Sequence, residues 1–417
     1  MNPETQQYLT SKFMEYYEKN GSSNVIVPTD LPEREFAFTY FDRDGMFRHK
    51  DFSRLDELLC HLRVNGPSHS YLSAAHYLDP GAGTMGQKGW KGTDLIFDID
   101  ADHLNVPCKM KHDRWVCRDC GKSGKGERLD KCPSCQSTRL EDETWLCDEC
   151  INQAKLETIK LIEILQDDFG FSRKETEVTY TGHRGYHTRV ESSKIRFLTT
   201  TARREIVDYI TGKGIDLQAH GLIEQGPEGS RKVAGPSKND TGWGLRIFNS
   251  VEKMIKDGEA PSELLKDKQS VLAGMAEGRW DVVKGVALKK WIKLAGEAVE
   301  CYGIAHIDEP VTTDIHRLIR LKGSLHGKTG FAVTKVSDLE SFDPFKEAIA
   351  FKSDETVTVH IGYGNSFRIG DQIYGDPRKP FKDQTLKFPL AAAIFYMCKG
   401  AGEIAHEDEK GYQVARN

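Results

Sequence analysis

The stretch DLIFDIDAD, residues 94–102, joins the pattern of a buried strand to a cluster of carboxylates. Successive side chains of a strand point to opposite faces, so Leu95 and Phe97 fall on one face. Asp98 and Asp100 fall on the other face, about 6.5 to 7 Å apart at Cα, where they can share one or two divalent cations. A solvated strand end is the alternative for such a pair taken alone. The stretch predicts a mixed α/β core whose small sheet carries both acids on its open face, with helices covering the other face.

Length and composition limit the classes of protein that are possible. A chain of 417 residues is long for one compact core, so we expect a single core with insertions, or two to three domains. A hydrophobic content of 38% and a charged content of 29% are typical of a globular protein. The net charge of -5 argues against coating nucleic acid by bulk attraction. Contact with nucleic acid would need a local patch or a partner.

The hydropathy pattern argues against a membrane protein. The longest apolar run, FPLAAAIFYMC at 388–398, is about half of what a bilayer requires and predicts a core helix. The first twenty residues predict a polar amphipathic helix without the apolar centre of a signal peptide. We therefore expect a cytoplasmic protein with no membrane partner.

A glycine-bearing turn at 180–190, YTGHRGYHTRV, follows a strand pattern. Gly182 and Gly185 bracket His183 and Arg184, which suits a tight turn whose backbone N–H groups face an anion, with an arginine that can fork onto a phosphate. An ordinary turn with exposed cations is the alternative.

A second basic segment, DEPVTTDIHRLIRLKGSLHGKTG, occupies residues 308–330. Cations crowd around three of its glycines, and they are Arg317, Arg320, Lys322, His326 and Lys328. Cations on a glycine-rich turn fit a triphosphate, whereas a solvated basic face is the competing interpretation.

Seven of the ten cysteines lie between Cys108 and Cys150, and six of them form three C-x-x-C pairs. In an intracellular chain this spacing indicates metal binding rather than disulfides. With His112 the block offers eight candidate zinc ligands, enough for two tetrahedral sites.

Together these motifs resemble the catalytic small subunit of the archaeal and eukaryotic DNA primase, in its archaeal form. The similarity runs from REFAF at 34–38 through MFRHKDF, SYLSAAHY, KGWKGTDLIFDIDADH and DFGF to TGHRGYH and RLIRLKGSLHGKTGF. LIFDIDADH, GHRGYH and GSLHGKTG in this order make the resemblance specific.

The resemblance implies a DNA-directed RNA polymerase of DNA replication, a nucleotidyltransferase that starts primers on single-stranded DNA from nucleoside triphosphates. It implies two-metal catalysis with Mg²⁺ or Mn²⁺ and a heterodimer with a primase large subunit. The paired metal-binding aspartates of the family fall on Asp98 and Asp100. Its third carboxylate, eighteen residues before His326, falls on Asp308, with Asp314 as an alternative.

The family's nucleotide-binding positions also carry over. They fall on Thr181, His183, Arg184, His187, Arg320, His326 and Lys328. Two of them depart from the family's S-G-R-R-G form: Thr181 replaces a serine and keeps its hydroxyl, while His183 replaces the first arginine. Glu35 and Arg48 are further family positions near the site.

The resemblance also organises the cysteine block. A family zinc site joins an early cysteine to a C-x-x-C pair before a helix, which assigns Cys108, His112, Cys147 and Cys150, with His103 as the alternative to His112. An inserted zinc ribbon would use Cys117, Cys120, Cys132 and Cys135.

The expected domains are a primase catalytic core, a zinc-binding insertion and a helical insertion. The core takes residues 1–102, 151–253 and 304–417, the zinc insertion 103–150, and the helical insertion 254–303. Two other functions compete with the primase. A metal-dependent nuclease would use the acids without the triphosphate-directed turns, and a non-enzymatic zinc-ribbon nucleic-acid-binding protein would leave the acids without a purpose.

Overall fold

The computed structural model describes residues 1–227, 231–283 and 286–406, which form two compact units. The first unit contains Met1–Lys155, Glu177–Thr200 and the described residues from Pro310 onward. The second contains Leu156–Thr176 and Thr201–Glu309. Helices and sheets occur together in the first unit, so the predicted mixed α/β class is confirmed.

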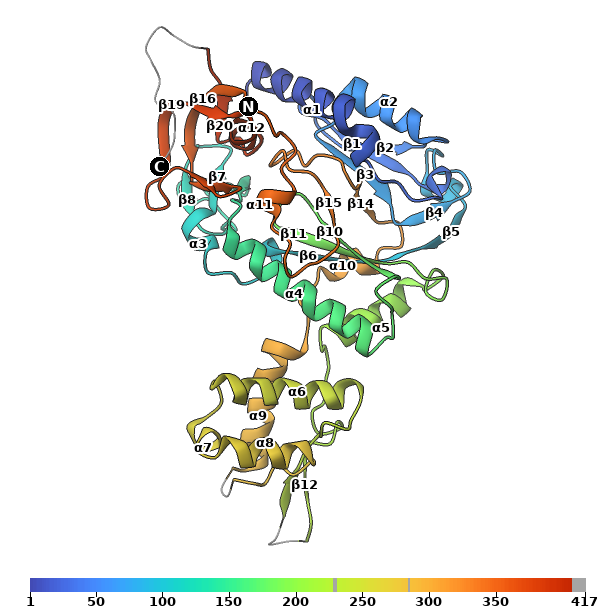
Figure 1. The fold of residues 1–417 in the computed structure, drawn as a ribbon, viewed down its shortest axis with the longest axis vertical. Helices are drawn as coiled ribbons and strands as arrows, with labels where there is room; N and C mark the ends of the chain where they lie inside the picture. Colours follow the sequence, from blue (N-terminus) through green and yellow to red (C-terminus); the bar gives the residue numbers. More distant parts are fainter. Residues whose placement is uncertain (228–230, 284–285, 407–417) are drawn as a thin grey trace. The chain divides into compact units, whose positions relative to one another are not determined.

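Two four-stranded sheets organise the first unit (Figure 1). One has the order β15-β10-β11-β6, with β6 (Leu95–Asp100), β10 (Thr176–Tyr180), β11 (Gly185–Val190) and β15 (Thr334–Val336). The other has the order β14-β3-β1-β2, with β1 (Phe36–Thr39), β2 (Phe47–Lys50), β3 (His69–Ser73) and β14 (Leu318–Arg320). A two-stranded sheet pairs β4 (Ala75–Tyr77) with β5 (Trp90–Thr93).

The alternation predicted for β6 is observed. Leu95 and Phe97 are fully buried, whereas Asp98 and Asp100 are partly exposed. β6 and β11 are antiparallel, with Asp98 opposite His187 and Asp100 opposite Gly185. The register therefore places the turn at 181–184 beside the acidic end of β6.

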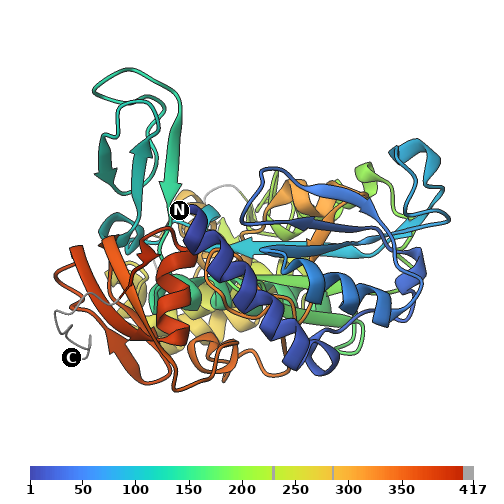
Figure 2. The ribbon, with the colours of Figure 1, turned by 90° about the horizontal axis from the view of Figure 1, so that it is seen from above.

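Helices α1 (Pro3–Asn24) and α2 (Leu55–Asn65) pack together, and α2 lies against the β1 sheet. The rings of Phe38 in β1 and His61 in α2 have centroids 4.4 Å apart. The apolar run near the C-terminus forms α12 (Leu390–Cys398), whose side chains are buried apart from a partly buried Ala391, as predicted for a core helix. Figure 2 shows α12 beside α1 and a three-stranded sheet, and the strands of that sheet are β16 (Thr356–Gly364), β19 (Phe381–Pro389) and β20 (Gly402–Ile404).

The cysteine block forms a small module with its own core. Its sheet has the order β8-β7-β9, with β7 (Arg114–Cys117), β8 (Ser123–Lys125) and β9 (Leu140–Glu143). Trp115, Cys117, Cys132 and Leu140 bury one another there. In Figure 2 these strands project from the rest of the first unit. The short α3 (Lys109–His112) precedes them, and α4 (Asp148–Asp167) follows.

The second unit is mainly helical. It contains most of α5 (Thr200–Ile210), then α6 (Gly242–Asp257), α7 (Ser262–Leu265), α8 (Lys268–Ala276), α9 (Leu288–Ala298) and the hairpin of β12 (Ile223–Gln225) and β13 (Lys232–Ala234). Its core includes Trp280 and Trp291, whose rings lie 4.9 Å apart. The helical insertion predicted at 254–303 falls within this larger unit.

Residues 226–247 are rich in glycine, proline and serine, a composition that predicts a loop, but this prediction is wrong over part of the segment. Residues 232–234 form β13, and α6 begins at Gly242, because Trp243, Ile247 and Phe248 recur at helical spacing and bury their side chains. Residues 228–230 of the predicted loop lie outside the described part of the chain.

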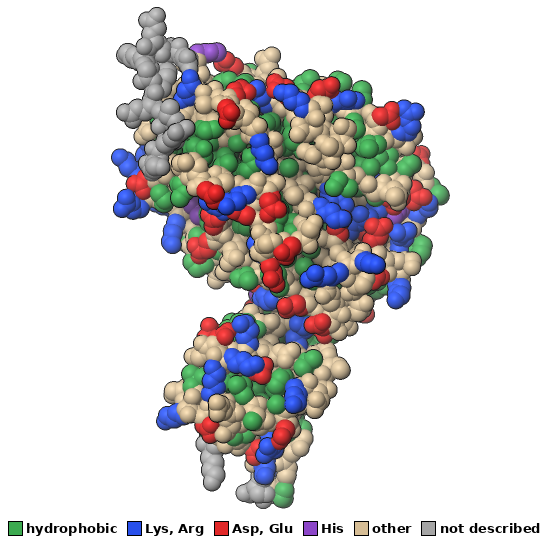
Figure 3. All heavy atoms as spheres, in the orientation of Figure 1, with side chains coloured by type: hydrophobic (Ala, Val, Ile, Leu, Met, Phe, Trp, Pro, Cys, Tyr) green, Lys and Arg blue, Asp and Glu red, His purple; other side chains and the backbone are tan. Residues whose placement is uncertain are grey.

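Two surface properties agree with the composition. Among the described residues, no helix is long and apolar enough to cross a membrane. On the face seen in Figure 3, basic and acidic side chains are intermixed, as the small net charge leads one to expect.

Candidate active site

A cavity of about 480 Å³ lies in the first unit and is lined by strands of both four-stranded sheets. It collects most of the residues that the sequence motifs singled out, and these are Asp98, Asp100, Thr181, His183, His187, Arg320, His326 and Lys328. It also collects Arg48, Tyr71, Asp102, Asp314 and Arg317. Carboxylates and cations therefore share one cavity.

The acids of β6 repel one another in this cavity. Burial, together with the charges of Asp102 and Asp98, raises the pKa of Asp100 to about 6. The Asp100 carboxylate accepts a hydrogen bond from the Asp102 N–H at 2.9 Å, and Nε2 of His187 lies 3.5 Å from Asp98 Oδ1. Burial also lowers the pKa of His187 to about 3, so this imidazole is neutral near pH 7. Such a site favours a divalent cation that neutralises both carboxylates.

Glycine is required on both sides of the turn after β10. Gly182 has a φ of 86°, and a Cβ there would come within 2.6 Å of His326 Cβ. A Cβ on Gly185 would come within 2.4 Å of the Ile99 carbonyl oxygen. The two glycines therefore bring the turn against both β6 and the segment that carries His326.

His183 and His326 stack as parallel rings, with centroids 5.2 Å apart and an interplanar angle of 4°. Nδ1 of His326 accepts the Lys328 N–H at 3.2 Å, which leaves Nε2 as the protonated nitrogen. Burial and nearby cations hold the pKa of both histidines well below the usual range. The pair is therefore neutral, and His326 can donate a hydrogen bond to an anion.

Two arginines of the cavity are held by side chains beside it. Nη1 of Arg320 lies 2.7 Å from Nδ1 of His69, a partly buried imidazole. Arg48 forms a bidentate ion pair with the fully buried Glu35, at 3.0 and 3.2 Å. The carried-over positions Glu35 and Arg48 thus lie beside the cavity, with only Arg48 lining it.

Two residues predicted for the site do not line the cavity. Asp308 precedes α10 (Glu309–Thr313) in the second unit, whereas Asp314, directly after that helix, lines the cavity. The spacing of eighteen residues before His326 does not reveal where the short helix α10 ends. Of the two candidates for the third carboxylate, Asp314 is therefore the one that lines the cavity, while Asp308 stays a prediction from the resemblance.

Arg184 is the second such residue, because it points to the other side of its turn. Its guanidinium is 1% exposed and forms ion pairs with Asp102 and Asp113, the latter at 2.9 Å. Nη1 also donates to the Trp145 carbonyl oxygen at 3.1 Å. Arg184 therefore ties the acidic end of β6 to the cysteine module instead of lining the cavity.

The eight candidate zinc ligands gather into two groups of four. In each group, the ligand atoms lie within 4.8 Å of one another; the first group is Cys108, His112, Cys147 and Cys150, and the second is Cys117, Cys120, Cys132 and Cys135. The Sγ atoms of Cys108 and Cys150 are 3.3 Å apart, and His112 Nε2 lies 3.2 Å from Cys147 Sγ. His103, the alternative ligand, is not in the group.

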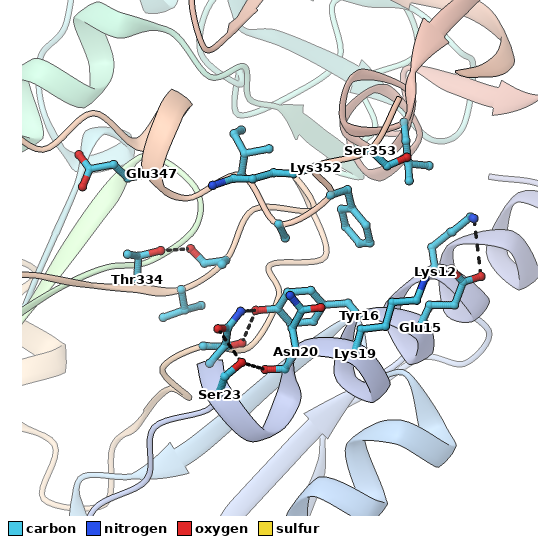
Figure 4. A pocket seen from close by; sticks show the side chains of 18 of the residues that line it. Lys12, Glu15, Tyr16, Lys19, Asn20, Ser23, Thr334, Glu347, Lys352 and Ser353 are labelled. Atoms are coloured by element: carbon cyan, nitrogen blue, oxygen red, sulfur yellow. Dashed lines mark hydrogen bonds and ion pairs between the residues drawn. The ribbon is translucent and has the colours of Figure 1, made fainter. Parts of the chain in front are cut away.

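A larger cavity of about 600 Å³ lies between α1 and residues 332–335 and 347–355 (Figure 4). Three of its four lysines form ion pairs: Lys12 with Glu15 and Glu355, Lys19 with Glu15, and Lys335 with Glu177. It has no pair of facing aspartates among its lining residues. The smaller cavity at β6 is therefore the better candidate for chemistry.

Comparison with known proteins agrees with the geometry of that cavity. The sequence profile of the family described as DNA primase small subunit matches residues 129–338. The protein named DNA primase small subunit PriS from Methanothrix thermoacetophila is 33% identical over 97% of this chain and 100% of its own length. The chain belongs to the DNA primase small subunit family. The proteins of the same name from Methanococcoides burtonii and Archaeoglobus fulgidus are each 33% identical, over 97% and 95% of this chain and 99% and 98% of their own lengths.

The resemblance to DNA primase inferred from the motifs is thereby confirmed, and with it the class of enzyme, a nucleotidyltransferase. In this primase subunit the family match includes the turn at 181–187 and the segment at 317–331, which line the cavity together. Asp102 was overlooked although it stands in the acidic stretch itself, whereas no local pattern marks Tyr71 as a site residue.

Proposed function

We propose that the cavity at β6 is the site at which this primase subunit joins nucleotides into primers on single-stranded DNA. The observation that carries the proposal is that Asp98 and Asp100 share one cavity with His326 and Lys328. Acids that bind a divalent cation and cations that bind phosphates are the two requirements of nucleotidyl transfer. A nuclease that cuts DNA binds no nucleoside triphosphate, so it has no need of cations placed for a triphosphate.

The carboxylates fit Mg²⁺ or Mn²⁺, which prefer oxygen ligands. Asp98 and Asp100 would hold the metal, and Asp314, which also lines the cavity, would add the third carboxylate. Two such ions would lower the pKa of the attacking 3′-hydroxyl and stabilise the pyrophosphate leaving group. Within the chain itself, His187 lies beside Asp98, with its Nε2 3.5 Å from Asp98 Oδ1.

The triphosphate would lie along the basic side of the cavity. Arg320, fixed by His69, and Lys328 offer positive charge, and His326 offers an N–H donor. Charge-assisted hydrogen bonds of this kind neutralise the charge that builds on phosphates in the transition state.

Both cysteine groups fit Zn²⁺. Ligands of a tetrahedral zinc with Zn–S bonds of about 2.3 Å lie about 3.8 Å apart, close to the spacings of 3.2 to 3.6 Å found in both groups. Nδ1 of His112 lies 2.8 Å from Asp113, and such a contact commonly fixes the tautomer of a metal-binding histidine. Sites with four protein ligands leave no position for substrate, so we assign both a structural role.

Template, nucleoside triphosphates and a primase large subunit are the expected partners. Starting a chain requires a second nucleotide whose 3′-hydroxyl attacks the first, so the complete enzyme needs a second nucleotide position.

The assay that separates the competing functions uses the full chain with unprimed single-stranded DNA, labelled nucleoside triphosphates and Mg²⁺ or Mn²⁺. New labelled oligonucleotides support the primase, and shortened template supports the nuclease. Retention of the template without any new or shortened strand would support a zinc-ribbon binding protein and contradict the proposal.

A further inference from the structure

Lys399 reaches the candidate active site from a part of the chain that no motif includes. It follows directly after α12, and its backbone N–H donates to the Phe395 carbonyl oxygen at 2.9 Å. Its Nζ lies 2.9 Å from Nε2 of His183, a residue 216 positions earlier in the chain. Because α12 is buried over almost its whole length, it holds this lysine in a fixed position.

The direction of this hydrogen bond determines the tautomer of His183. When Lys399 is an ammonium group it can only donate, so Nε2 of His183 then accepts, and the proton of the neutral ring lies on Nδ1. His326, stacked on His183, has its tautomer fixed by the backbone of Lys328. Each of the two stacked rings is thus oriented by a lysine, one through its side chain and one through its backbone.

The surroundings of Lys399 are rich in positive charge. Burial, with Arg184 and Lys328 nearby, lowers the pKa of Lys399 to about 7, although Asp102 and Asp113 oppose this. Over the described residues, no carboxylate forms an ion pair with Lys399, whereas Arg184 is paired with both Asp102 and Asp113. An anion in the cavity would therefore relieve the cost of burying the ammonium group.

Lys399 itself does not line the active-site cavity. It lines a neighbouring cavity of about 250 Å³ that also includes His112 and Trp145, whereas His183 lines the cavity that holds the acids. Any effect on a bound nucleotide must therefore pass through His183.

We propose that Lys399 is a positioning residue that turns the protonated nitrogen of His183 toward the triphosphate and places a positive charge behind it. The proposal rests on the proposed function, which places the nucleotide in the cavity that His183 lines.

The test measures the affinity of the full chain for ATP, ADP and AMP with Mg²⁺, by equilibrium dialysis of the labelled nucleotides. Lys399→Met should weaken ATP binding at least about 10-fold, as expected for one charge-assisted hydrogen bond, and AMP binding far less. Lys399→Arg should retain most of the affinity. Lys382→Met, an exposed lysine of β19, removes the same charge and should change nothing.

The double variant His183→Arg with Lys399→Met tests the proposal most sharply, because an arginine at position 183 carries its own charge. It should recover ATP affinity relative to Lys399→Met alone, which a merely structural role of Lys399 does not predict. If Lys399→Met unfolds the chain, Lys399→Gln removes the charge with a polar side chain instead, and its ATP affinity with and without His183→Arg decides the question.

Unchanged ATP affinity in Lys399→Met, or a double variant no better than the single one, would overturn the proposal. Failure of the proposed function would look different, since the unaltered protein would then bind ATP no more tightly than AMP.

Discussion

Asp98 and His187 face each other across β6 and β11, with His187 Nε2 3.5 Å from Asp98 Oδ1. Two residues further along the same pair of strands, Asp100 faces Gly185. This register brings the metal-binding acids and the phosphate-directed turn into one cavity, although they lie more than eighty residues apart in the chain.

The close approach of the two strands predicts a strong effect of Gly185→Ala. The new Cβ would meet the Ile99 carbonyl oxygen at 2.4 Å and Asp100 Cα at 3.0 Å, and both are backbone atoms that cannot move aside alone. We expect a loss of about 1 to 3 kcal/mol in the free energy of unfolding, measured by urea denaturation, and a loss of primer synthesis because Asp100 is displaced. Gly362→Ala in β16 is the matched control, since nothing lies within 4 Å of its Cβ position. Equal effects of both substitutions would contradict this account.

The choice between Asp314 and Asp308 can be tested by a matched pair of isosteric changes. Asp314 lines the cavity and Asp308 does not, so Asp314→Asn should lower the rate of nucleotide incorporation by about 10²-fold or more, while Asp308→Asn should leave it nearly unchanged. The rates are compared at saturating nucleotide. The opposite order would restore the carboxylate that counting along the sequence selects.

The two cysteine groups predict about two zinc ions per chain by metal analysis. Cys147→Ser should remove one zinc and lower stability, because its group adjoins Asp113 and Arg184 in the core of the first unit.

The second group should be dispensable for folding. Its Cys117 and Cys135 Sγ atoms lie 3.6 Å apart, so a deletion between these residues can be closed by a short linker. The shortened chain should hold one zinc and still extend primers, with any defect in template engagement or initiation. A chain that unfolds on this deletion, or an intact chain with one zinc, would show that the ligands are divided differently.

The sequence predicts well what is local in the chain. The alternation of β6, the glycine-bearing turn and the grouping of the C-x-x-C pairs all follow from spacing over a few residues. Contacts between residues that are far apart in the chain could not be predicted from the sequence. Arg184 looks like a phosphate ligand next to His183, but Asp113 of the cysteine module captures it. Lys399 carries no signal, because only the folding of α12 brings it to His183.

The buried His76 and its two carboxylate partners predict that the free energy of unfolding depends on pH. His76, 1% exposed, has Nδ1 2.8 Å from Asp30 and Nε2 3.3 Å from Asp94. Burial lowers its pKa, but hydrogen bonds to the two carboxylates outweigh burial and raise the pKa above the ordinary value.

A pKa that is raised by folding stabilises the protein below the pKa of the unfolded chain, near 6.5, and that stability is lost as the pH rises through the folded-state value. Urea denaturation at a series of pH values should show this decline for the unaltered protein. His76→Gln should lack the part of the decline that His76 causes. A decline of the same size in both proteins would assign it to other groups.

The most direct test of the central claim measures initiation on unprimed single-stranded DNA by Asp98→Asn and Asp100→Asn, with Asp383→Asn as a control on the exposed part of β19. Loss of metal-dependent transition-state stabilisation should reduce synthesis on the order of 10³-fold in either variant. Unfolding curves should stay near those of the unaltered protein, because removing one of two repelling carboxylates opens no core cavity. Near-normal primer synthesis by both variants would contradict the assignment of β6 as the catalytic strand.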